Sequence, residues 1–239
     1  MGRETVAAEN PLKAKFISRL NRFTVLVEIE GERVRAYLPN SGRLREFLVP
    51  SRILILEKAE KDGKRKTEYT VVGALTETGV KVSIDARMPN KLMAEALRQD
   101  ELEEFKGFRL LKAEPKLEEG RLDFLLEGAN GEKFLVEVKS CTLAEDGVAM
   151  FPDAPTERGQ RHLKALTRIV EKGWKTAIIF LAQREDVEKF QPNHREDPKF
   201  AETLKMAVEK GVKAYAYKAA FDGKILRILG KIPVEVVGG

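Results

Sequence analysis

The stretch from residue 121 to residue 139, RLDFLLEGANGEKFLVEVK, determines the fold expected for the second half of the chain. Alternating apolar residues stand on both sides of the turn-forming run Gly128-Ala129-Asn130-Gly131, and this pattern predicts two strands joined by a hairpin. A symmetric hairpin centred near residue 130 places Leu125 opposite Leu135 and Glu127 opposite Lys133, and both are favourable cross-strand pairs.

In the same register Asp123 lies opposite Glu137. Because side chains alternate between the two faces of a strand, Glu137 and Lys139 share a face with Asp123. Two carboxylates and a lysine on one patch of sheet are what metal-dependent cleavage of a phosphodiester bond requires, since hard cations take oxygen ligands. The alternative interpretation is a surface cluster of cross-strand ion pairs, which contributes little to stability.

The composition is that of a globular protein. The 239 residues are 43% hydrophobic and 34% charged, and this length suffices for one large or two small domains. The single cysteine, Cys141, excludes a disulfide framework within the chain. The start does not resemble a signal peptide, and no apolar run approaches the roughly 20 residues of a membrane span, so we expect a cytoplasmic protein with no membrane partner.

Positive charge is concentrated in one part of the sequence. The formal net charge of the chain is +5, and between residues 13 and 45 eight basic residues stand against three acidic ones. The basic residues are Lys13, Lys15, Arg19, Arg22, Arg33, Arg35, Arg43 and Arg45. A concentrated basic segment suggests an anionic partner, and a solvated surface of mixed charge is the alternative.

Residues 12 to 85 are predicted to form short strands separated by Gly, Asn and charged turns. The candidate strands are 22–29, 33–38, 53–56, 69–74 and 80–84. About five short strands in this length fit a small closed barrel such as an OB-fold, although an SH3-like barrel would look similar. We place the domain boundary after residue 85, which gives a first domain of residues 1–85 and a second domain of residues 86–239.

The second domain is predicted to alternate helices and strands. Asn90 is the expected N-cap of its first helix, and Thr156 is the expected cap of the second. The further predicted elements are a strand at 108–113, the hairpin, helices at about 155–171 and 198–210, a buried strand at 177–182, and strands at 212–217 and 225–229. This order predicts an α/β layer fold with a mixed sheet flanked by helices.

The order of elements and the Asp…Glu-x-Lys trio resemble the PD-(D/E)XK nuclease superfamily. A closer resemblance, over nearly the whole chain, is to the sugar fermentation stimulation protein family (SfsA). The segments that carry it are Asn21-Arg22-Phe23, Leu38-Pro39-Asn40-Ser41-Gly42-Arg43, Arg121-Leu122-Asp123-Phe124-Leu125-Leu126, Glu137-Val138-Lys139 and Phe151-Pro152-Asp153-Ala154-Pro155-Thr156-Glu157-Arg158-Gly159-Gln160.

This resemblance implies an N-terminal OB-like β-barrel followed by a PD-(D/E)XK nuclease-like domain. It also implies DNA binding and a regulatory effect on sugar use in bacteria. Two positions depart from the family's pattern: Tyr37 stands where the family often has His, and Ser41 where it often has Thr. Neither departure touches the acidic trio, but Tyr37 could alter a nucleic-acid contact.

The resemblance further implies roles for the residues of the hairpin. Asp123, Glu137 and, as in related nucleases, the backbone carbonyl of Val138 are expected to hold Mg²⁺ or Mn²⁺. Lys139 is expected to orient the attacking water or to offset the charge that develops on phosphorus.

Three residues outside the hairpin are further candidates for the same site. Glu95 lies on the helix that follows Asn90, where related nucleases often supply a carboxylate, and Glu114 ends the strand before the hairpin. An ordinary surface acid is the alternative interpretation of Glu95. Gln160 begins the part of the next helix that could face the site, and we expect it to take part in catalysis.

The same helix carries other polar residues. Arg158, Arg161 and Lys164 could hold a phosphate backbone, and a helix of ordinary mixed charge is the alternative. His162 is one of only two histidines, so we do not expect a histidine-built metal centre and interpret His162 as structural. Cys141 is interpreted as a small buried residue without chemistry.

In the first domain, cations, a planar amide and an aromatic ring could follow a nucleic-acid backbone and stack on bases, as OB-folds do. These candidates are Arg22, Arg35, Tyr37, Asn40 and Arg43. Phe23 belongs to an alternating pattern, and we interpret it as a core residue. The turn at Gly42 could bind phosphate through backbone N–H groups, or it could be a structural loop.

The leading hypothesis is a DNA-binding protein with a divalent-metal-dependent endonuclease centre, acting on double- or single-stranded DNA. The first alternative is a DNA-binding transcriptional regulator of sugar metabolism whose nuclease-like domain does not cut. An enzyme that acts on RNA is the second alternative, because OB-folds bind both polymers. The oligomeric state stays open, a homodimer included.

Overall fold

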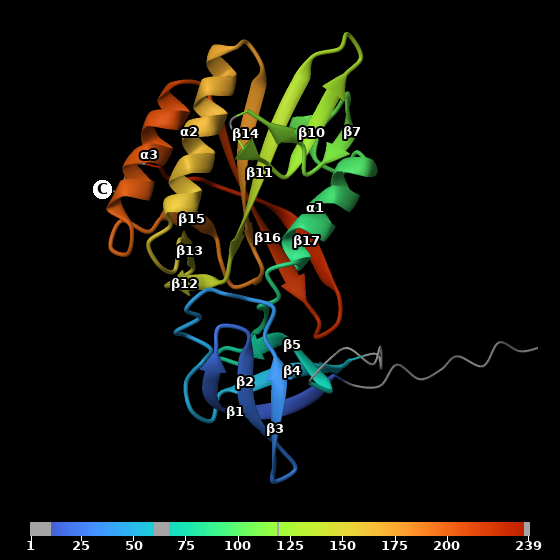
Figure 1. The fold of residues 1–239 in the computed structure, drawn as a ribbon, viewed down its shortest axis with the longest axis vertical. Coiled ribbons are helices and arrows are strands. Elements are labelled where there is room, and N and C mark those ends of the chain that lie inside the picture. Colours follow the sequence, from blue (N-terminus) through green and yellow to red (C-terminus); the bar gives the residue numbers. More distant parts are fainter. Residues whose placement is uncertain (1–10, 60–66, 119, 237–239) are drawn as a thin grey trace, which may run out of the picture.

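The computed structural model describes residues 11–59, 67–118 and 120–236, and the predicted domain ends at residues 1 and 239 lie outside this part. The described residues form a small N-terminal barrel and a larger C-terminal domain, which are stacked along the long axis of the molecule (Figure 1). The predicted fold class, an OB-like barrel followed by a mixed sheet flanked by helices, is confirmed.

The barrel is a closed sheet of five strands with one further strand attached. Its elements are β1 (Leu12–Asn21), β2 (Thr24–Ile29), β3 (Glu32–Tyr37), β4 (Ile53–Lys58), β5 (Tyr69–Leu75) and β6 (Lys81–Ser83). The strand order is β3-β2-β1-β4-β5-β6, and a short parallel pairing of β3 with β5 closes the barrel. The first strand, β1, was not among the predicted ones because a β-bulge between Phe16 and Ser18 interrupts its alternation.

The C-terminal domain contains one large sheet, two small ones and three α-helices among its described residues. The helical elements are α1 (Met88–Arg98), the 3₁₀ turn η1 (Glu103–Phe105), α2 (Glu157–Glu171) and α3 (Pro198–Glu209). The large sheet contains β7 (Phe108–Ala113), β10 (Phe124–Gly128), β11 (Lys133–Cys141), β14 (Lys175–Ala182), β16 (Lys213–Phe221) and β17 (Leu226–Ile232). The small sheets contain β8 (Lys116–Leu117), β9 (Gly120–Arg121), β12 (Leu143–Glu145), β13 (Val148–Phe151) and β15 (Lys189–Pro192).

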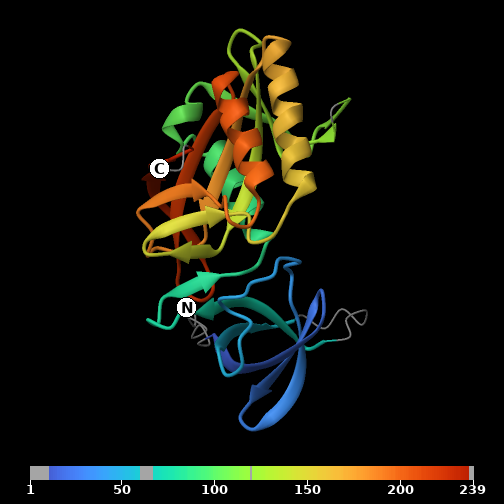
Figure 2. The same ribbon diagram turned by 90° about the vertical axis from the view of Figure 1, so that its left-hand side faces the viewer.

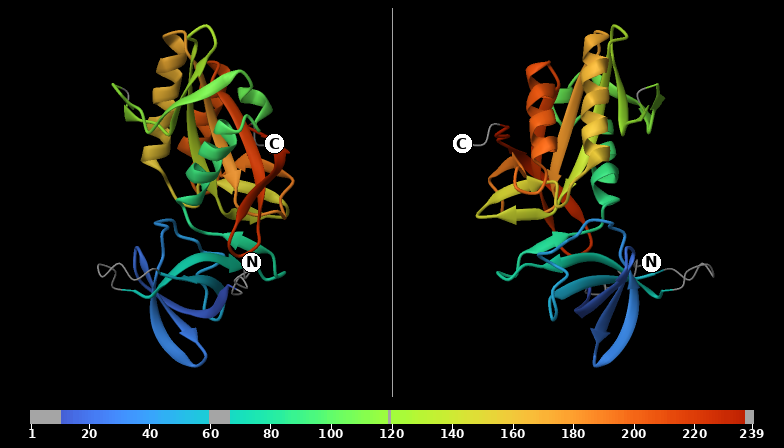
Figure 3. Two further views of the ribbon diagram at one scale, coloured as in Figure 1. Left: turned by 90° about the vertical axis from the view of Figure 1, so that its right-hand side faces the viewer. Right: turned by 60° about the vertical axis from the view of Figure 1, so that its left-hand side comes forward.

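The large sheet is mixed, with the order β17-β16-β14-β11-β10-β7 and a parallel centre formed by β11, β14 and β16. Helices α2 and α3 lie side by side on one face of it (Figure 2). Helix α1 covers the opposite face, as the two views in Figure 3 show. The domain therefore has three layers. Because side chains alternate between the two faces of each central strand, they contribute to two separate hydrophobic cores.

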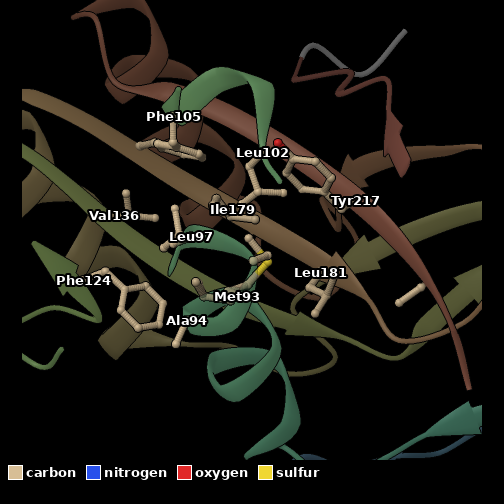
Figure 4. Close-up of a cluster of buried hydrophobic side chains, with 14 of the residues drawn as sticks. Met93, Ala94, Leu97, Leu102, Phe105, Phe124, Val136, Ile179, Leu181 and Tyr217 are labelled. Carbon is tan, nitrogen blue, oxygen red and sulfur yellow. The ribbon is translucent and has the colours of Figure 1, made fainter. Parts of the chain in front are cut away.

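The core beneath α1 is built from residues far apart in the sequence. Met93 and Leu97 of α1 pack with Val136 of β11, Ile179 of β14 and Tyr217 of β16 (Figure 4). The second core lies under α2 and α3 and includes Leu135, on the opposite face of β11 from Val136. Consequently the side chains that follow Leu135 at intervals of two, Glu137 and Lys139, project toward the layer of α2.

Of the two residues predicted to cap the first two helices, one does so and the other does not. Thr156 caps α2, because its Oγ1 accepts a hydrogen bond from Gly159 N at 3.0 Å. Asn90 does not cap α1, which is a correction: the helix begins earlier, at Met88, and Arg87 is its N-cap residue. Pro89, which has no N–H group and a fixed φ, suits the first turn and allows this earlier start.

The two domains are held together by buried contacts. Arg184, only 4% exposed, donates from Nη1 to Glu46 Oε2 of the barrel at 2.7 Å and from Nε to Asp186 Oδ1 at 2.6 Å. The backbone N of Ser83, at the end of β6, donates to the carbonyl of Gln183, just after β14, at 3.1 Å. This hydrogen bond joins the barrel to the C-terminal domain. The barrel is thus fixed against the edge of the second domain.

Gly73 provides a test of this interface. A Cβ atom built on Gly73 in β5 would lie 2.4 Å from Phe221 Cε1 and 2.8 Å from the Val82 carbonyl oxygen, so Gly73→Ala forces neighbouring backbone to move. We expect the substitution to destabilise the protein by about 2 kcal/mol in urea unfolding. The double substitution Gly73→Ala with Phe221→Leu should recover part of the loss, and equal stability of Gly73→Ala and wild type would contradict this packing.

No helix in the described ranges is long and apolar enough to cross a lipid bilayer.

Candidate functional site

The predicted hairpin is present in the predicted register. Strands β10 and β11 pair Phe124 with Val136, Leu125 with Leu135 and Glu127 with Lys133. Asp123 lies just before β10, where the backbone pairing of β10 with β11 ends, and its side chain takes over the contact with β11. Its Oδ2 accepts a hydrogen bond from Val138 N at 2.7 Å. Asp123 is therefore fixed directly against the strand that carries Glu137 and Lys139.

Glu137 is the most buried member of the trio, with a side chain that is 3% exposed. Its Oε1 accepts hydrogen bonds from Lys139 Nζ, at 2.5 Å, and from His162 Nδ1 of α2. Its Oε2 is also buried and has no hydrogen-bond partner among the residues that the structure describes. Because a buried carboxylate oxygen without a partner is costly, this atom needs a water molecule or a cation to complete its bonding.

Asn90 holds Asp123 from the other side. Its Nδ2 donates to Asp123 Oδ1 at 2.7 Å, which links α1 to the hairpin. The side chain expected to cap the helix therefore contacts the acidic trio instead. The sequence signal was the pair Pro89-Asn90, but a partner 33 residues away in the chain is not visible from local pattern.

The electrostatics of the two carboxylates differ. Burial and the neighbouring Glu137 raise the pKa of Asp123 to about 6, despite the hydrogen bond from Val138 N and the charge of Lys139. Burial acts in the same direction on Glu137, but Lys139 and His162 outweigh it and lower the pKa of that carboxyl. Both groups are ionised above pH 6, and the site then holds more negative charge than Lys139 neutralises.

These residues fit a hard divalent cation. The donors are carboxylate oxygens, and Glu137 Oε2 is free to accept a bond to a metal. In residues 11–59, 67–118 and 120–236, no set of three or more Asp, Glu, His or Cys side chains is arranged around one point. A site of two carboxylates suits Mg²⁺, which commonly takes one or two of them and keeps several waters.

Three of the residues predicted for this site have other partners in the structure. Glu95 is exposed and its carboxylate contacts Gln99 and Arg98 on its own helix, where the helical period turns it about 140° away from Asn90. Glu114 is exposed and pairs with Arg121 at 3.3 Å, although its backbone N donates to the Asp123 carbonyl at 2.8 Å.

Gln160 is the third. Its Nε2 donates to both oxygens of Asp197, at 3.2 and 3.3 Å. Asp197 is buried, caps α3 through Phe200 N at 2.9 Å and accepts a bond from Thr156 N at 2.8 Å. In this structure Gln160 therefore joins the starts of α2 and α3 and does not contact Glu137.

His162 was interpreted as structural from the sequence, and in the structure its Nδ1 contacts Glu137 Oε1. Its Nε2 accepts a hydrogen bond from Arg158 Nε at 3.4 Å, and its side chain is 14% exposed. The spacing of Arg158 and His162, one helical turn apart, was visible in the sequence, but the contact across to β11 was not. Cys141 is buried as expected, and burial raises the pKa of its thiol.

The cations and the aromatic ring predicted for nucleic acid take different positions on the barrel. Arg22 and Arg35 are exposed. Tyr37 is partly buried, and the guanidinium carbon of Arg87 lies 5.9 Å from the centre of its ring. Arg43 is exposed and pairs with Glu196 of the C-terminal domain at 3.0 Å.

Asn40 has a different environment. It is 9% exposed, its Nδ2 donates to the Ile84 carbonyl at 2.9 Å, and its Oδ1 accepts from Gly42 N at 2.8 Å. Leu44 N donates to Asp153 Oδ2 of the C-terminal domain at 3.1 Å. Because side chains already bind these backbone N–H groups, the turn at Gly42 is a structural loop that joins two of the segments carrying the family resemblance.

Phe23 is not a core residue, which corrects our interpretation. It is 44% exposed, and Leu20 beside it on the same hairpin is 45% exposed. Strand β2 begins only at Thr24, so Phe23 belongs to the turn before the alternating pattern starts. Arg19 fixes this turn by donating to the Arg22 carbonyl at 2.7 Å and to the Gly42 carbonyl at 2.6 Å. An aromatic ring is thus displayed beside Arg22.

Comparison with known proteins extends over both domains. Residues 17–84 match the family model described as SfsA N-terminal OB domain, and residues 87–224 match the model described as Sugar fermentation stimulation protein RE domain. The solved structure of Pyrococcus furiosus SfsA in complex with Ca²⁺ is 35% identical, with a TM-score of 0.86, and the match covers 98% of this chain and 100% of that one.

Two curated relatives are more similar in sequence. The sugar fermentation stimulation protein homolog of Moorella thermoacetica is 44% identical over 227 residues, which cover 95% of this chain and 97% of the relative. The homolog of Methanothermobacter thermautotrophicus is 44% identical over 214 residues, which cover 90% of this chain and 88% of the relative. On the agreement of both domains and of nearly the full length, this chain belongs to the sugar fermentation stimulation protein family.

Proposed function

We propose that this protein is a metal-dependent nuclease that binds DNA and hydrolyses phosphodiester bonds. One observation carries the proposal: Asp123, Glu137 and Lys139 lie together at the hairpin, and Glu137 keeps a buried oxygen without a partner in the described part of the chain. A DNA substrate agrees with the cytoplasmic location expected from the sequence.

Asp123 and Glu137 Oε2 are the proposed ligands of Mg²⁺ or Mn²⁺. The carbonyl of Val138 is the proposed third ligand, because in an extended strand the N–H and C=O groups of one residue point to the same side, and Val138 N already faces Asp123. The Ca²⁺ in the Pyrococcus furiosus SfsA structure supports a cation with oxygen ligands. When bound, the cation polarises the scissile phosphate and lowers the pKa of the attacking water.

The residues of the chain itself position the reaction. Asn90 and Val138 N hold the Asp123 carboxylate in place. Lys139 Nζ, 11% exposed, is the cation nearest the buried carboxylates and offsets the charge that develops on the phosphate oxygens. Hydrolysis adds the water oxygen to phosphorus and breaks the bond to the leaving deoxyribose oxygen. The attacking water loses one proton to the solvent, and the leaving oxygen takes up a proton from the solvent.

The barrel supplies the nucleic-acid surface. Arg22 and Arg35 are exposed and can contact phosphates, and Phe23 can stack on a base. Arg43 joins them once a phosphate replaces its partner Glu196. Tyr37 contributes through its ring, which already lies near Arg87, whereas the side-chain bonds of Asn40 support the loop rather than a ligand.

The proposal is tested with purified protein, plasmid DNA and single-stranded DNA, in the presence of Mg²⁺, Mn²⁺ or a chelator. We expect cleavage with either metal and none with the chelator, and no cleavage by Asp123→Ala in any condition. Intact DNA with wild-type protein and both metals, together with retained binding, would reject the nuclease and support the regulator.

A DNA-binding regulator that does not cut is the second candidate, and one observation favours it. The side chains of Glu95 and Glu114 contact other residues, so within the described ranges the site has two of the four carboxylates that the sequence proposed. A site with fewer carboxylates binds a metal ion more weakly. This fits a domain that keeps the nuclease-like fold to bind DNA without cutting it. The cleavage assay above separates the two candidates.

Removing the exposed ring of Phe23 is expected to weaken nucleic-acid binding. Stacking of a base on an aromatic side chain contributes about 1–3 kcal/mol, so Phe23→Ala should lower the affinity for a single-stranded oligonucleotide about tenfold. Fluorescence anisotropy across a salt series measures this, and the salt slope should stay unchanged because the phosphate contacts remain. Met206→Ala, at a similarly exposed apolar residue on α3, is the matched control. Equal affinities of Phe23→Ala and wild type would remove Phe23 from the binding surface.

A further inference from the structure

Two side chains donate to the same oxygen of Glu137, Oε1. Lys139 Nζ lies 2.5 Å from Oε1, His162 Nδ1 contacts the same atom, and the two nitrogens are 3.4 Å apart. A carboxylate oxygen can accept both bonds. The asymmetry lies between the two oxygens, because Oε1 accepts from two side chains while the buried Oε2 has no partner among the described residues.

The hydrogen bonds of His162 define its tautomer. An ionised carboxylate can only accept, so His162 Nδ1 donates to Glu137 Oε1, and Nε2 is left to accept from Arg158 Nε. The proton of the neutral ring is then on Nδ1, where it is donated to Glu137 Oε1. Arg158 is exposed on α2, and the chain of contacts runs from the protein surface through His162 to the buried carboxylate.

Lys139 has two tasks in the proposed reaction. In the structure it neutralises Glu137, whereas in the proposed reaction its ammonium group must approach the phosphate. If Lys139 were the only donor, its departure would leave Oε1 of a carboxylate that is 3% exposed without a partner. The carboxylate could then rotate and present either oxygen to the cation.

We propose that His162 is a positioning residue that holds Glu137 Oε1 while Lys139 turns toward the reacting phosphate, so that Glu137 Oε2 stays directed at the cation. This inference rests on the proposed nuclease function and assigns to it a residue outside the acidic trio. It places His162 in the second layer around the metal, where such partners typically change affinity or activity by 10–100-fold.

A merely structural role makes different predictions. If His162 only joined α2 to β11, its replacement would lower the stability of the fold but would leave the metal affinity and turnover of the folded protein unchanged. The positioning role requires a donor at the place of Nδ1 and no particular ring. Asparagine supplies such a donor, because its Nδ2 occupies the position of Nδ1, whereas the amide of glutamine reaches the position of Nε2.

The test compares His162→Ala, His162→Asn and His162→Gln for Mn²⁺ affinity by calorimetry and for single-turnover cleavage of bound DNA. We expect His162→Ala and His162→Gln to lose about 10–100-fold in affinity or turnover, and His162→Asn to recover most of the loss. His194→Ala, at the other histidine, which is exposed, is the control and should match wild type. Wild-type Mn²⁺ affinity and turnover in His162→Ala, or equal losses in the asparagine and alanine variants, would overturn the inference.

A measurement on the metal-free wild type needs no variant to fold. Long-range ¹H–¹⁵N NMR should show His162 as the neutral Nδ1–H tautomer, and the Nε2–H tautomer would contradict the proposed arrangement.

Failure of the proposed function and failure of the inference about His162 give different results. If wild type neither binds Mn²⁺ nor cuts, the proposed function fails and the role of His162 falls with it; if wild type is active and His162→Ala is equally active, only the inference about His162 fails.

Discussion

Replacing Lys139 with alanine is expected to lower the rate of DNA cleavage by about 10²–10³-fold, the usual effect of removing one positioned charge donor from a transition state. The ammonium group lies 2.5 Å from Glu137 Oε1 and is only 11% exposed, so no solvent cation can replace it at full strength. DNA affinity should change little, since the residues proposed to bind the polymer lie on the barrel. Single-turnover cleavage and anisotropy, measured on the same preparation, separate the two effects.

Strand β11 offers a matched control for this substitution. Lys133 lies on the same strand and also pairs with a glutamate, Glu127, but at the far end of the hairpin from Asp123. Lys133→Ala should cut DNA at the wild-type rate. Comparable losses in both variants would mean that cleavage depends on the stability of the hairpin, and an active Lys139→Ala would remove Lys139 from the reaction.

Asp123→Asn is expected to stabilise the metal-free protein by about 3 kcal/mol at pH 8, although it should abolish cleavage. Burial and Glu137 raise the pKa of Asp123 from an ordinary value near 3.8 to about 6, and a rise of this size costs the ionised folded state about that free energy. Asparagine keeps the shape and an oxygen that can accept from Val138 N, while the amide of Asn90 can turn to face it. Under the proposed function, Asp123 lowers the stability of the metal-free protein in exchange for binding the cation.

The pH dependence follows from the sign of the shift. Because the folded-state pKa is raised, the stability associated with protonated Asp123 is complete below about pH 4 and is lost as the pH rises through 6. Urea unfolding in chelator should therefore show a gap between Asp123→Asn and wild type that opens between pH 4 and pH 8. Added Mn²⁺ should narrow it by stabilising wild type alone.

Asp222 supplies a control of opposite sign. The N–H groups of Ile225 and Lys224 lower the pKa of this carboxyl to about 2, so Asp222→Asn should lose stability at neutral pH. If Asp123→Asn is instead less stable than wild type in chelator at pH 8, the carboxylate is not strained by its surroundings, and the case for a missing cation weakens.

The parts of the site that the sequence predicted are those set by local rules. The turn at 128–131 and the alternation around it fix the register of β10 and β11, and the confirmed pair of Leu125 with Leu135 carries Asp123 to the strand of Glu137. Thr156 and the barrel strands follow from capping and from alternation in the same way. No knowledge of distant contacts is needed for these elements.

The residues that were missed depend on contacts between layers. His162 meets Glu137 only because α2 packs on that face of the sheet, and Asn90 meets Asp123 only because α1 starts two residues before it. Phe23 was assigned to the core from an alternation that begins one residue later, where β2 starts. Helix and strand periods define which side of an element a residue occupies, but not what lies opposite it.

The proposed metal site can be located directly by crystals grown with Mn²⁺ and measured at the manganese absorption edge. We expect one anomalous peak within bonding distance of an Asp123 carboxylate oxygen and of Glu137 Oε2, with His162 still on Glu137 Oε1. Manganese bound elsewhere with this pair left empty, or no peak at a concentration that supports cleavage, would contradict a metal centre at the hairpin.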